Sequence, residues 1–200
     1  MSLPDAMSGC HALVLAAGAA TRFAGAKLLA DFRGRPLVTW PVQAALASPV
    51  ETVTVVLGSG ANDVQAALDS IADSRLRTVR CADWQVGLSA SLRCGLGNLP
   101  TDCRAVLIFL GDMPNVSADA AARLIAAALD GAPAALPEFA GMPGHPVAIA
   151  RPLFKRLLAL EGDRGARAIL EHTEGVVRIQ VDDPGCIQDI DTKEDIDGLA

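Results

Sequence analysis

A short loop near the amino end combines small residues with two cations, a combination that suits a triphosphate. Residues 15–27 form this loop directly after a short apolar run. Gly18 and Gly25 permit a positive φ and a close approach of the backbone, so that consecutive N–H groups can point inward and bind an anion. Arg22 adds a planar guanidinium and Lys27 a compact ammonium. The residues expected to contact the ligand are Leu15, Ala16, Ala17, Gly18, Ala19, Arg22 and Lys27.

An aspartate follows the most apolar run of the chain, residues 105–110. Asp112 comes just after this run, next to Gly111, which permits a close turn. Mg²⁺ prefers one or two carboxylates together with phosphate oxygens and water, so Asp112 is predicted to hold Mg²⁺. A plain turn or helix-capping role is the alternative. The predicted catalytic residues are Arg22, Lys27 and Asp112.

A second acidic segment lies near the carboxyl end. Asp189 and Asp191 alternate along a piece that is expected to be extended, so they share one face and one of them can complete the metal site. Asp191 or Thr192 is also placed to cap the last helix. The predicted metal ligands are therefore Asp112, Asp189 and Asp191.

The composition indicates an ordinary globular enzyme-sized domain. The chain has 200 residues, of which 51% are hydrophobic, with a net charge of -6. We expect a single domain over residues 10–200 after a loose tail at 1–9. The acidic balance argues against nucleic acid as a partner, and no apolar stretch is long enough to span a membrane. Five widely spaced cysteines and the lack of an apolar leader favour reduced thiols and a cytoplasmic protein.

Short aliphatic runs alternate with alanine-rich helical patterns along the chain. Continuous apolar strands are typical of a mostly parallel sheet that helices cover on both faces, so we predict an α/β fold. In such sheets ligands bind beyond the carboxyl ends of the strands, where the loop and Asp112 lie. The predicted strands are 12–15, 52–57, 78–81, 105–110, 134–137, 147–150 and 176–181. The predicted helices are 37–47, 61–69, 88–96, 118–128, 152–160, 166–172 and 193–199.

Several of these segments, in this order, resemble the molybdenum-cofactor nucleotidyltransferases. The resemblance covers the chain from about residue 12 to residue 199. The Leu-Ala-Ala-Gly form at 15–18 is similar to the cytidylyltransferase branch, whereas the guanylyltransferase branch tends to have Leu-Ala-Gly-Gly. The segments that carry the resemblance are Leu15–Gly18 through Arg22 and Lys27, Gly111–Pro114, Gly144–Pro146, Gly162–Arg167 and Asp189–Thr192.

The resemblance implies a Rossmann-like three-layer αβα sandwich of the nucleotide-diphospho-sugar transferase type. It also implies Mg²⁺-dependent transfer of CMP from CTP to the terminal phosphate of molybdopterin, with release of pyrophosphate. A molybdenum hydroxylase or its maturation chaperone is a further implied partner. The nucleotide-binding set then gains Ser89, Ser91 and Gly111, and the acceptor-binding set is Gly144, His145, Asp163 and Arg164.

Local alternatives remain for some of these residues. Ser89 could instead cap a helix, and Asp163 could cap the turn between two helices. GTP in place of CTP, or another phosphate acceptor, is an alternative for the reaction. An erythritol-phosphate cytidylyltransferase is less favoured, because such enzymes usually have Pro before the lysine and this chain has Ala26. A non-catalytic protein that delivers the cofactor to a molybdenum hydroxylase is the rival from another class.

Overall fold

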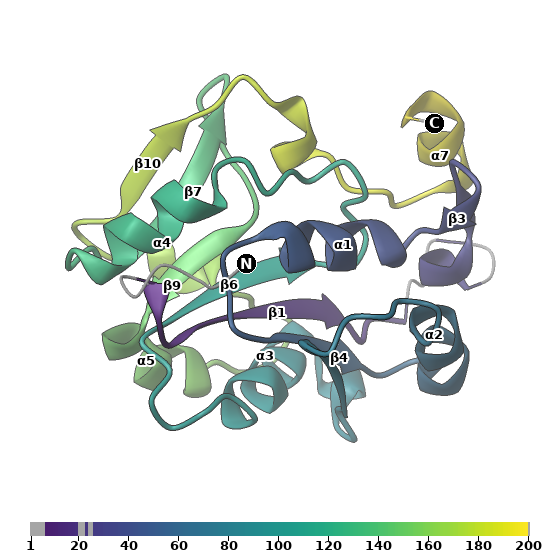
Figure 1. The fold of residues 1–200 in the computed structure, drawn as a ribbon, viewed down its shortest axis with the longest axis horizontal. Coiled ribbons are helices and arrows are strands. Elements are labelled where there is room, and N and C mark those ends of the chain that lie inside the picture. The colour runs from purple at the N-terminus through teal and green to yellow at the C-terminus, as the bar shows by residue number, and fades with distance from the viewer. Residues whose placement is uncertain (1–6, 20–22, 24–25, 200) are drawn as a thin grey trace.

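A mostly parallel sheet forms the centre of the fold (Figure 1). The computed structural model describes residues 7–19, 23 and 26–199. The strands run in the order β10-β7-β9-β6-β1-β4-β5, and β8 pairs with β7. Their bounds are β1 Cys10–Ala16, β4 Val53–Leu57, β5 Leu76–Arg80, β6 Ala105–Leu110, β7 Ala134–Phe139, β8 Met142–Pro143, β9 Val147–Ala150 and β10 Val177–Gln180.

Strand β1 lies in the middle of the sheet. Its Ala12 is in register with Val53 of β4 and with Leu107 of β6, and both neighbours are parallel to it. Every residue of β1 is buried, as expected for a strand that is covered on both faces. Strand β9 is antiparallel to both β6 and β7, so the sheet is mixed only toward that edge. In Figure 1, β1 and β6 point to the end of the molecule where α7 lies.

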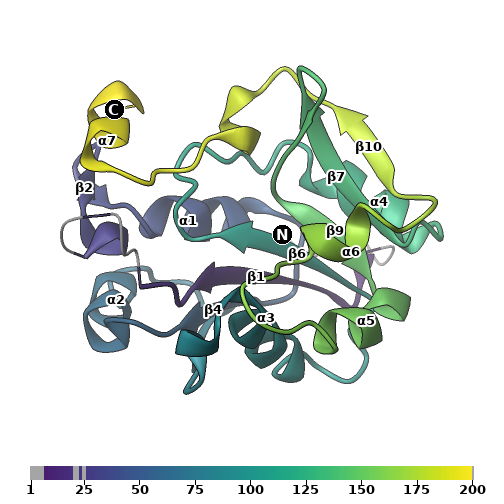
Figure 2. The ribbon, with the colours of Figure 1, turned by 180° about the vertical axis from the view of Figure 1, so that it is seen from behind.

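Helices cover both faces of the sheet. Ala12 and Val14 of β1 pack in the cluster that includes residues of α1 and α4, whereas Leu13 and Leu15 pack in the cluster that includes residues of α3, α5 and α6. Figure 2 shows α3 and α5 on the side of the sheet opposite α1. The predicted three-layer α/β fold is thus confirmed. The helices are α1 Thr39–Ala47, α2 Ala61–Leu68, α3 Leu88–Gly97, α4 Ala121–Leu129, α5 Phe154–Leu158, α6 Arg167–Leu170 and α7 Lys193–Leu199.

A third, smaller cluster attaches the carboxyl end to a hairpin. Phe32, Leu37 and Ile190 are fully buried in it, and Ile196 of α7 packs against them. The hairpin consists of β2 (Asp31–Phe32) and β3 (Arg35–Pro36), and in Figure 1 α7 lies beside β3. This cluster fixes the segment before α7 against the rest of the fold.

The predicted strands and helices are all present; the bounds of β6, β9 and α7 are as predicted, and the others differ at one or both ends. The predicted helix 152–160 is shorter, because a 3₁₀ turn η4 (Arg151–Leu153) precedes α5. The sequence analysis did not predict β2, β3 or β8, which have two residues each and carry too little pattern to recognise. All five cysteines are free thiols, as expected. Within the described residues, no helix combines the length and the hydropathy needed to cross a membrane.

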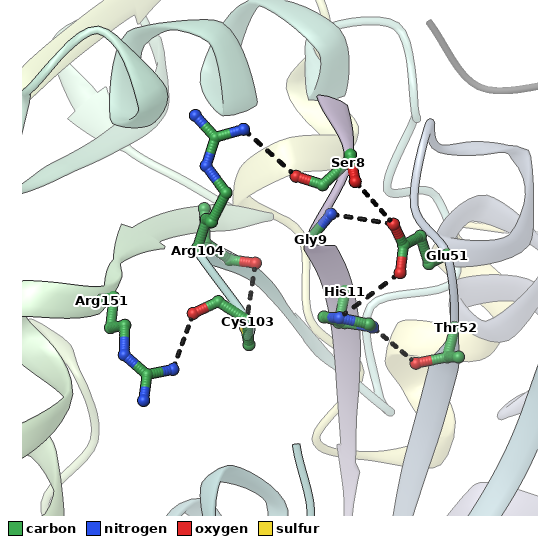
Figure 3. Close-up of polar contacts among 9 residues, drawn as sticks. Ser8, Gly9, His11, Glu51, Thr52, Cys103, Arg104 and Arg151 are labelled. Atoms are coloured by element: carbon green, nitrogen blue, oxygen red, sulfur yellow. Dashed lines mark hydrogen bonds and ion pairs between the residues drawn. The ribbon is translucent and has the colours of Figure 1, made fainter. Parts of the chain in front are cut away.

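Polar side chains surround the amino end of β1. This end lies on the side of the sheet opposite the carboxyl ends of β1 and β6. His11 is 1% exposed, and its Nδ1 lies 2.9 Å from the hydroxyl of Thr52. Its Nε2 has no hydrogen-bond partner among the described residues and lies 3.9 Å from Oε2 of Glu51 (Figure 3). The backbone N–H of Gly9 donates to the other carboxylate oxygen of Glu51 at 2.8 Å. Burial lowers the pKa of His11 below its ordinary value of 6.5, although Glu51 opposes this change.

We expect the free energy of unfolding to decrease as the pH is lowered below about 6.5, because of His11. The unfolded chain takes up a proton at His11 there, whereas the folded protein resists it, so the proton favours unfolding. Glu51 and Asp102 raise the pKa of His11, but burial, to which Arg77 adds, outweighs them and lowers it. Between pH 7.5 and 5.5 the free energy of unfolding should fall by about 1 kcal/mol more in the wild type than in His11→Gln. Urea unfolding at both pH values measures this, and equal losses in the two proteins would refute it.

Candidate functional site

Three of the predicted site residues meet at the carboxyl ends of β1 and β6. Nζ of Lys27 lies 2.9 Å from Oδ2 of Asp112 and 3.1 Å from Oδ1 of Asp191. The Lys27 side chain is only 8% exposed, whereas those of Asp112 and Asp191 are 29% and 35% exposed. Two carboxylates therefore converge on one buried ammonium, and their outer edges face solvent.

The fold fixes each of these three residues differently. Lys27 begins a 3₁₀ turn, η2 (Lys27–Leu29), and Val38 anchors this turn by donating its N–H to the carbonyl of Leu28 at 3.0 Å. Asp112 follows the buried strand β6. The N–H of Ile190 donates to the carbonyl of Asp112 at 2.9 Å, which brings the neighbouring Asp191 to the end of that strand.

A capping box at the start of α7 holds the backbone of Asp191. Oδ2 of Asp195 accepts hydrogen bonds from the N–H groups of Asp191 and Thr192, at 2.9 Å and 2.7 Å. The hydroxyl of Thr192 accepts in return from the N–H of Asp195 at 3.3 Å. This confirms the predicted cap at Thr192. Asp195 was missed by the sequence analysis, although the Thr-x-x-Asp pattern points to it.

Lys27 is a charged group in this environment. Burial alone would lower its pKa, but the charge and hydrogen bond of Asp112, together with those of Asp191, outweigh burial and raise the pKa. The ammonium is therefore retained at neutral pH. It is held between the carboxylates of Asp112 and Asp191.

The two carboxylates suit a divalent cation such as Mg²⁺ or Mn²⁺. Both ions prefer oxygen ligands, and Mg²⁺ usually takes one or two carboxylates and completes its shell with phosphate oxygens and water. Among residues 7–19, 23 and 26–199, no group of three or more His, Cys, Asp or Glu could hold a metal. Asp112 and Asp191 thus fit a metal that arrives with further ligands. Asp189 is exposed and its carboxylate is close enough to raise the pKa of His145.

The amino-end loop begins next to these residues. The carbonyl of Leu15 accepts from the N–H of Gly111 at 2.9 Å, so the loop starts beside Asp112. A Cβ on Gly111 would lie 3.0 Å from that carbonyl oxygen, which explains why glycine stands there. Gly18 is exposed and does not have the expected positive φ, and a Cβ on it would meet no atom of the described residues within 4 Å.

The structure describes only some of the other residues of this loop. Ala16 and Ala17 are buried, and Ala19 is exposed. The predictions for Arg22 and Gly25 lie outside the described residues. Gly58, which was not predicted from the sequence, also borders the loop. A Cβ on Gly58 would lie 2.5 Å from the carbonyl oxygen of Ala17. A glycine directly after a buried strand was the available clue.

The two serines predicted to bind the nucleotide are buried. Ser89 is 0% exposed and its hydroxyl accepts from Nη1 of Arg93 at 3.1 Å. The expected alternative for Ser89, a helix cap, is wrong, because α3 begins at Leu88 after Gly87 and Ser89 is already inside the helix. Ser91 is 4% exposed.

The segment with Asp163 packs against the start of α3. Oδ1 of Asp163 accepts from the N–H of Leu88 at 3.3 Å, and the carbonyl of Gly162 accepts from the N–H of Ser89 at 3.2 Å. Asp163 therefore bonds the first turn of α3, not the helix that follows it in the chain, because the two segments lie side by side. Arg164 is exposed.

His145 and Gly144 lie between β6 and the segment before α7. Nδ1 of His145 is 3.3 Å from the carbonyl oxygen of Ile108. The backbone N–H of His145 donates to the carbonyl of Cys186 at 2.7 Å. Burial lowers the pKa of His145, while Ile108, Asp112 and Asp189 act in the opposite direction. The imidazole is therefore neutral at pH 7 and lies near the acidic residues.

We expect Gly144→Ala to destabilise the fold beside this histidine. A Cβ at Gly144 would lie 2.4 Å from the carbonyl oxygen of Cys186, so one backbone must move. The free energy of unfolding should fall by about 3 kcal/mol, as for other overpacked sites. Gly97→Ala is the matched control, since a Cβ there meets nothing within 4 Å. Urea unfolding measures both variants, and equal stability of the two would contradict the expectation.

Comparison with known proteins places the chain in a family. The model of the MobA-like NTP transferase domain matches residues 12–177. The chain belongs to this family. The resemblance to the molybdenum-cofactor nucleotidyltransferases is thereby confirmed at the level of the domain, while the cytidylyl branch and the acceptor stay predictions.

Relatives of this MobA-like domain agree in fold. The bifunctional protein GlmU of Sorangium cellulosum is 39% identical over 107 residues, which are 52% of this chain and 23% of that protein. The chain thus spans about a quarter of the length of the curated relatives it matches. The Rv0371c homologue of Mycobacterium sp. strain JC1 is 31% identical with a TM-score of 0.81, over 96% of this chain and 95% of that one. Rv0371c of Mycobacterium tuberculosis H37Rv, solved in complex with manganese, is 25% identical with a TM-score of 0.79, over 95% and 97% of the chains.

Proposed function

We propose that the protein is a metal-dependent nucleotidyltransferase that transfers CMP from CTP to the terminal phosphate of molybdopterin and releases pyrophosphate. The observation that carries this proposal is the convergence of Lys27, Asp112 and Asp191 at the carboxyl ends of β1 and β6. One cation for phosphates and two oxygen ligands for a metal are what nucleotidyl transfer requires. Membership of the MobA-like NTP transferase domain family supports the same reaction class.

The reaction needs no covalent intermediate on the protein. A phosphate oxygen of the acceptor attacks the α-phosphorus, the bond to the bridging oxygen of the β-phosphate breaks, and pyrophosphate leaves with the electron pair. Such a transfer depends on positioning and on neutralisation of charge. Lys27 would bind the triphosphate and neutralise charge that grows on pyrophosphate. Arg22 and the backbone N–H groups of the loop would share this task.

Asp112 and Asp191 would hold the divalent cation, with Asp189 as a further candidate. When bound, the cation neutralises and aligns phosphate oxygens at the α-phosphorus. The manganese complex of the relative Rv0371c supports a divalent metal for this chain as well. The capping box of Asp195 and Thr192 would keep the Asp191 carboxylate at the site, because it fixes the Asp191 backbone.

CTP is proposed as the nucleotide because residues 15–18 resemble the cytidylyl branch. Ser89 and Ser91 would lie on the side of the base and ribose, and Gly111 beside the loop. Gly144, His145, Asp163 and Arg164 would contact the acceptor. A molybdenum hydroxylase or its maturation chaperone would receive the product.

Pyrophosphate release with defined substrates tests the proposal. The protein is incubated with Mg²⁺, one of the four nucleoside triphosphates, and molybdopterin with or without bound molybdenum. Release with CTP alone, and a CMP-bearing pterin in the product, would support it. Release with GTP would overturn the base assignment, and release only with another phosphate would overturn the acceptor. Nucleotide binding without release for any acceptor would favour a non-catalytic carrier.

A further inference from the structure

The ammonium of Lys27 stands where the proposed metal would have to bind. Its nitrogen is within hydrogen-bond distance of one oxygen from each of the two carboxylates, at 2.9 Å and 3.1 Å. A metal bound between Asp112 and Asp191, at the point where they converge, would use the same two oxygens. A carboxylate oxygen already bonded to an ammonium is a poorer metal ligand, and the two positive charges repel at such short range. Lys27 and a divalent cation therefore compete for one position.

The backbones that carry the two carboxylates are held in place, whereas the Lys27 side chain can rotate. The backbone of Asp191 is fixed by the capping box and by the hydrogen bond from the N–H of its neighbour Ile190 to the Asp112 carbonyl. The backbone of Lys27 is fixed in η2, but its four-carbon stem ends in three rotatable donors. Its side chain begins beside the amino-end loop, where a triphosphate would lie under the proposed function. A strongly anionic ligand could thus draw the ammonium away from the carboxylates.

We infer that the Lys27 ammonium blocks the metal position until a nucleoside triphosphate binds it and draws it away from the carboxylates, so that a divalent metal alone binds weakly. The part that assigns the release to a triphosphate rests on the proposed function. The competition itself rests only on the contacts of Lys27 with Asp112 and Asp191. Lys27 would then contact the triphosphate, and the metal would contact the carboxylates, only when nucleotide and metal are both present.

Mn²⁺ binding in the absence of nucleotide tests this inference. Lys27→Met keeps the length of the stem and removes the charge, so Mn²⁺ should bind at least about tenfold more tightly than to the wild type, within the range of ordinary coupling between sites. Free Mn²⁺ is measured by its electron paramagnetic resonance signal during titration of the full chain. Adding Asp112→Asn to Lys27→Met should abolish the gain, which assigns it to this carboxylate pair.

Equal or weaker Mn²⁺ binding to Lys27→Met would overturn the inference. If Lys27→Met does not fold, Lys27→Gln replaces it, because the neutral amide still donates to one carboxylate. Exposed Lys155→Met is the matched control and should bind Mn²⁺ like the wild type. The result is independent of turnover: tight Mn²⁺ binding to Lys27→Met, together with no pyrophosphate release by the wild type with any nucleotide and acceptor, would refute the proposed function and leave the competition intact.

Discussion

Lys27→Ala should lower kcat/KM for nucleotidyl transfer by at least about 100-fold, the scale seen when an electrostatic group at a transition state is removed. The side chain is 8% exposed and carries the positive charge between the two carboxylates at the end of β6. Without it, the triphosphate loses its buried cation and approaches two carboxylates that have lost their ion pairs with Lys27. Steady-state pyrophosphate release with saturating Mg²⁺ measures the loss.

The loss should come from the chemistry of the site and not from unfolding. The outer edges of Asp112 and Asp191 face solvent, which can partly replace the lost ion pairs, so the free energy of unfolding should change by at most about 2 kcal/mol. Lys155→Ala, at an exposed position on α5, is the matched control and should keep full activity. Activity of folded Lys27→Ala within a factor of two of the wild type would remove Lys27 from the mechanism.

Asp112→Ala should have an effect of similar size, again at least about 100-fold on kcat/KM. The change removes one of the two carboxylates proposed to hold the cation, and it also releases Lys27 to bind Asp191 alone. Asp112→Asn keeps the size of the side chain but removes its charge, so it should be nearly as inactive. The same assay over a range of Mg²⁺ concentrations measures both variants.

A positional control separates charge at the site from charge elsewhere. Asp119 is exposed a few residues after Asp112, and Asp119→Ala should be fully active. If higher Mg²⁺ fully restored Asp112→Asn, Asp112 would contribute only to metal affinity. If both Asp112 variants were active at ordinary Mg²⁺, the proposed metal site would be in the wrong place.

The α/β fold and the succession of strands and helices along the chain were accessible from the sequence because the central strands are mostly apolar. Residues 12–15 of β1 and all of β6 are continuous apolar runs, and such runs occur where helices cover both faces of a parallel sheet. The short hairpin β2–β3 was not accessible, since two-residue strands carry no periodicity. Its role becomes visible only when Phe32 and Ile190 are seen in one cluster.

The candidate site was partly accessible for the same reason. Asp112 follows an obvious buried strand, and ligands bind at such strand ends. The contact of Lys27 with Asp191 joins residues 164 positions apart, and no local pattern reports it. Likewise, Asp163 accepts a hydrogen bond from the start of α3 because of tertiary packing, whereas the local pattern offered only a cap of its own turn as the alternative to acceptor binding.

The most direct test of the account is the location of metal and nucleotide on the protein. Crystals grown with Mn²⁺ and a non-hydrolysable CTP analogue should show one peak in the anomalous difference map, from an Mn²⁺ ion bound by Asp112 and Asp191. In the same map, the triphosphate should reach Nζ of Lys27, which has left the carboxylates. A metal peak away from both aspartates, or a triphosphate that does not approach Lys27, would contradict the account.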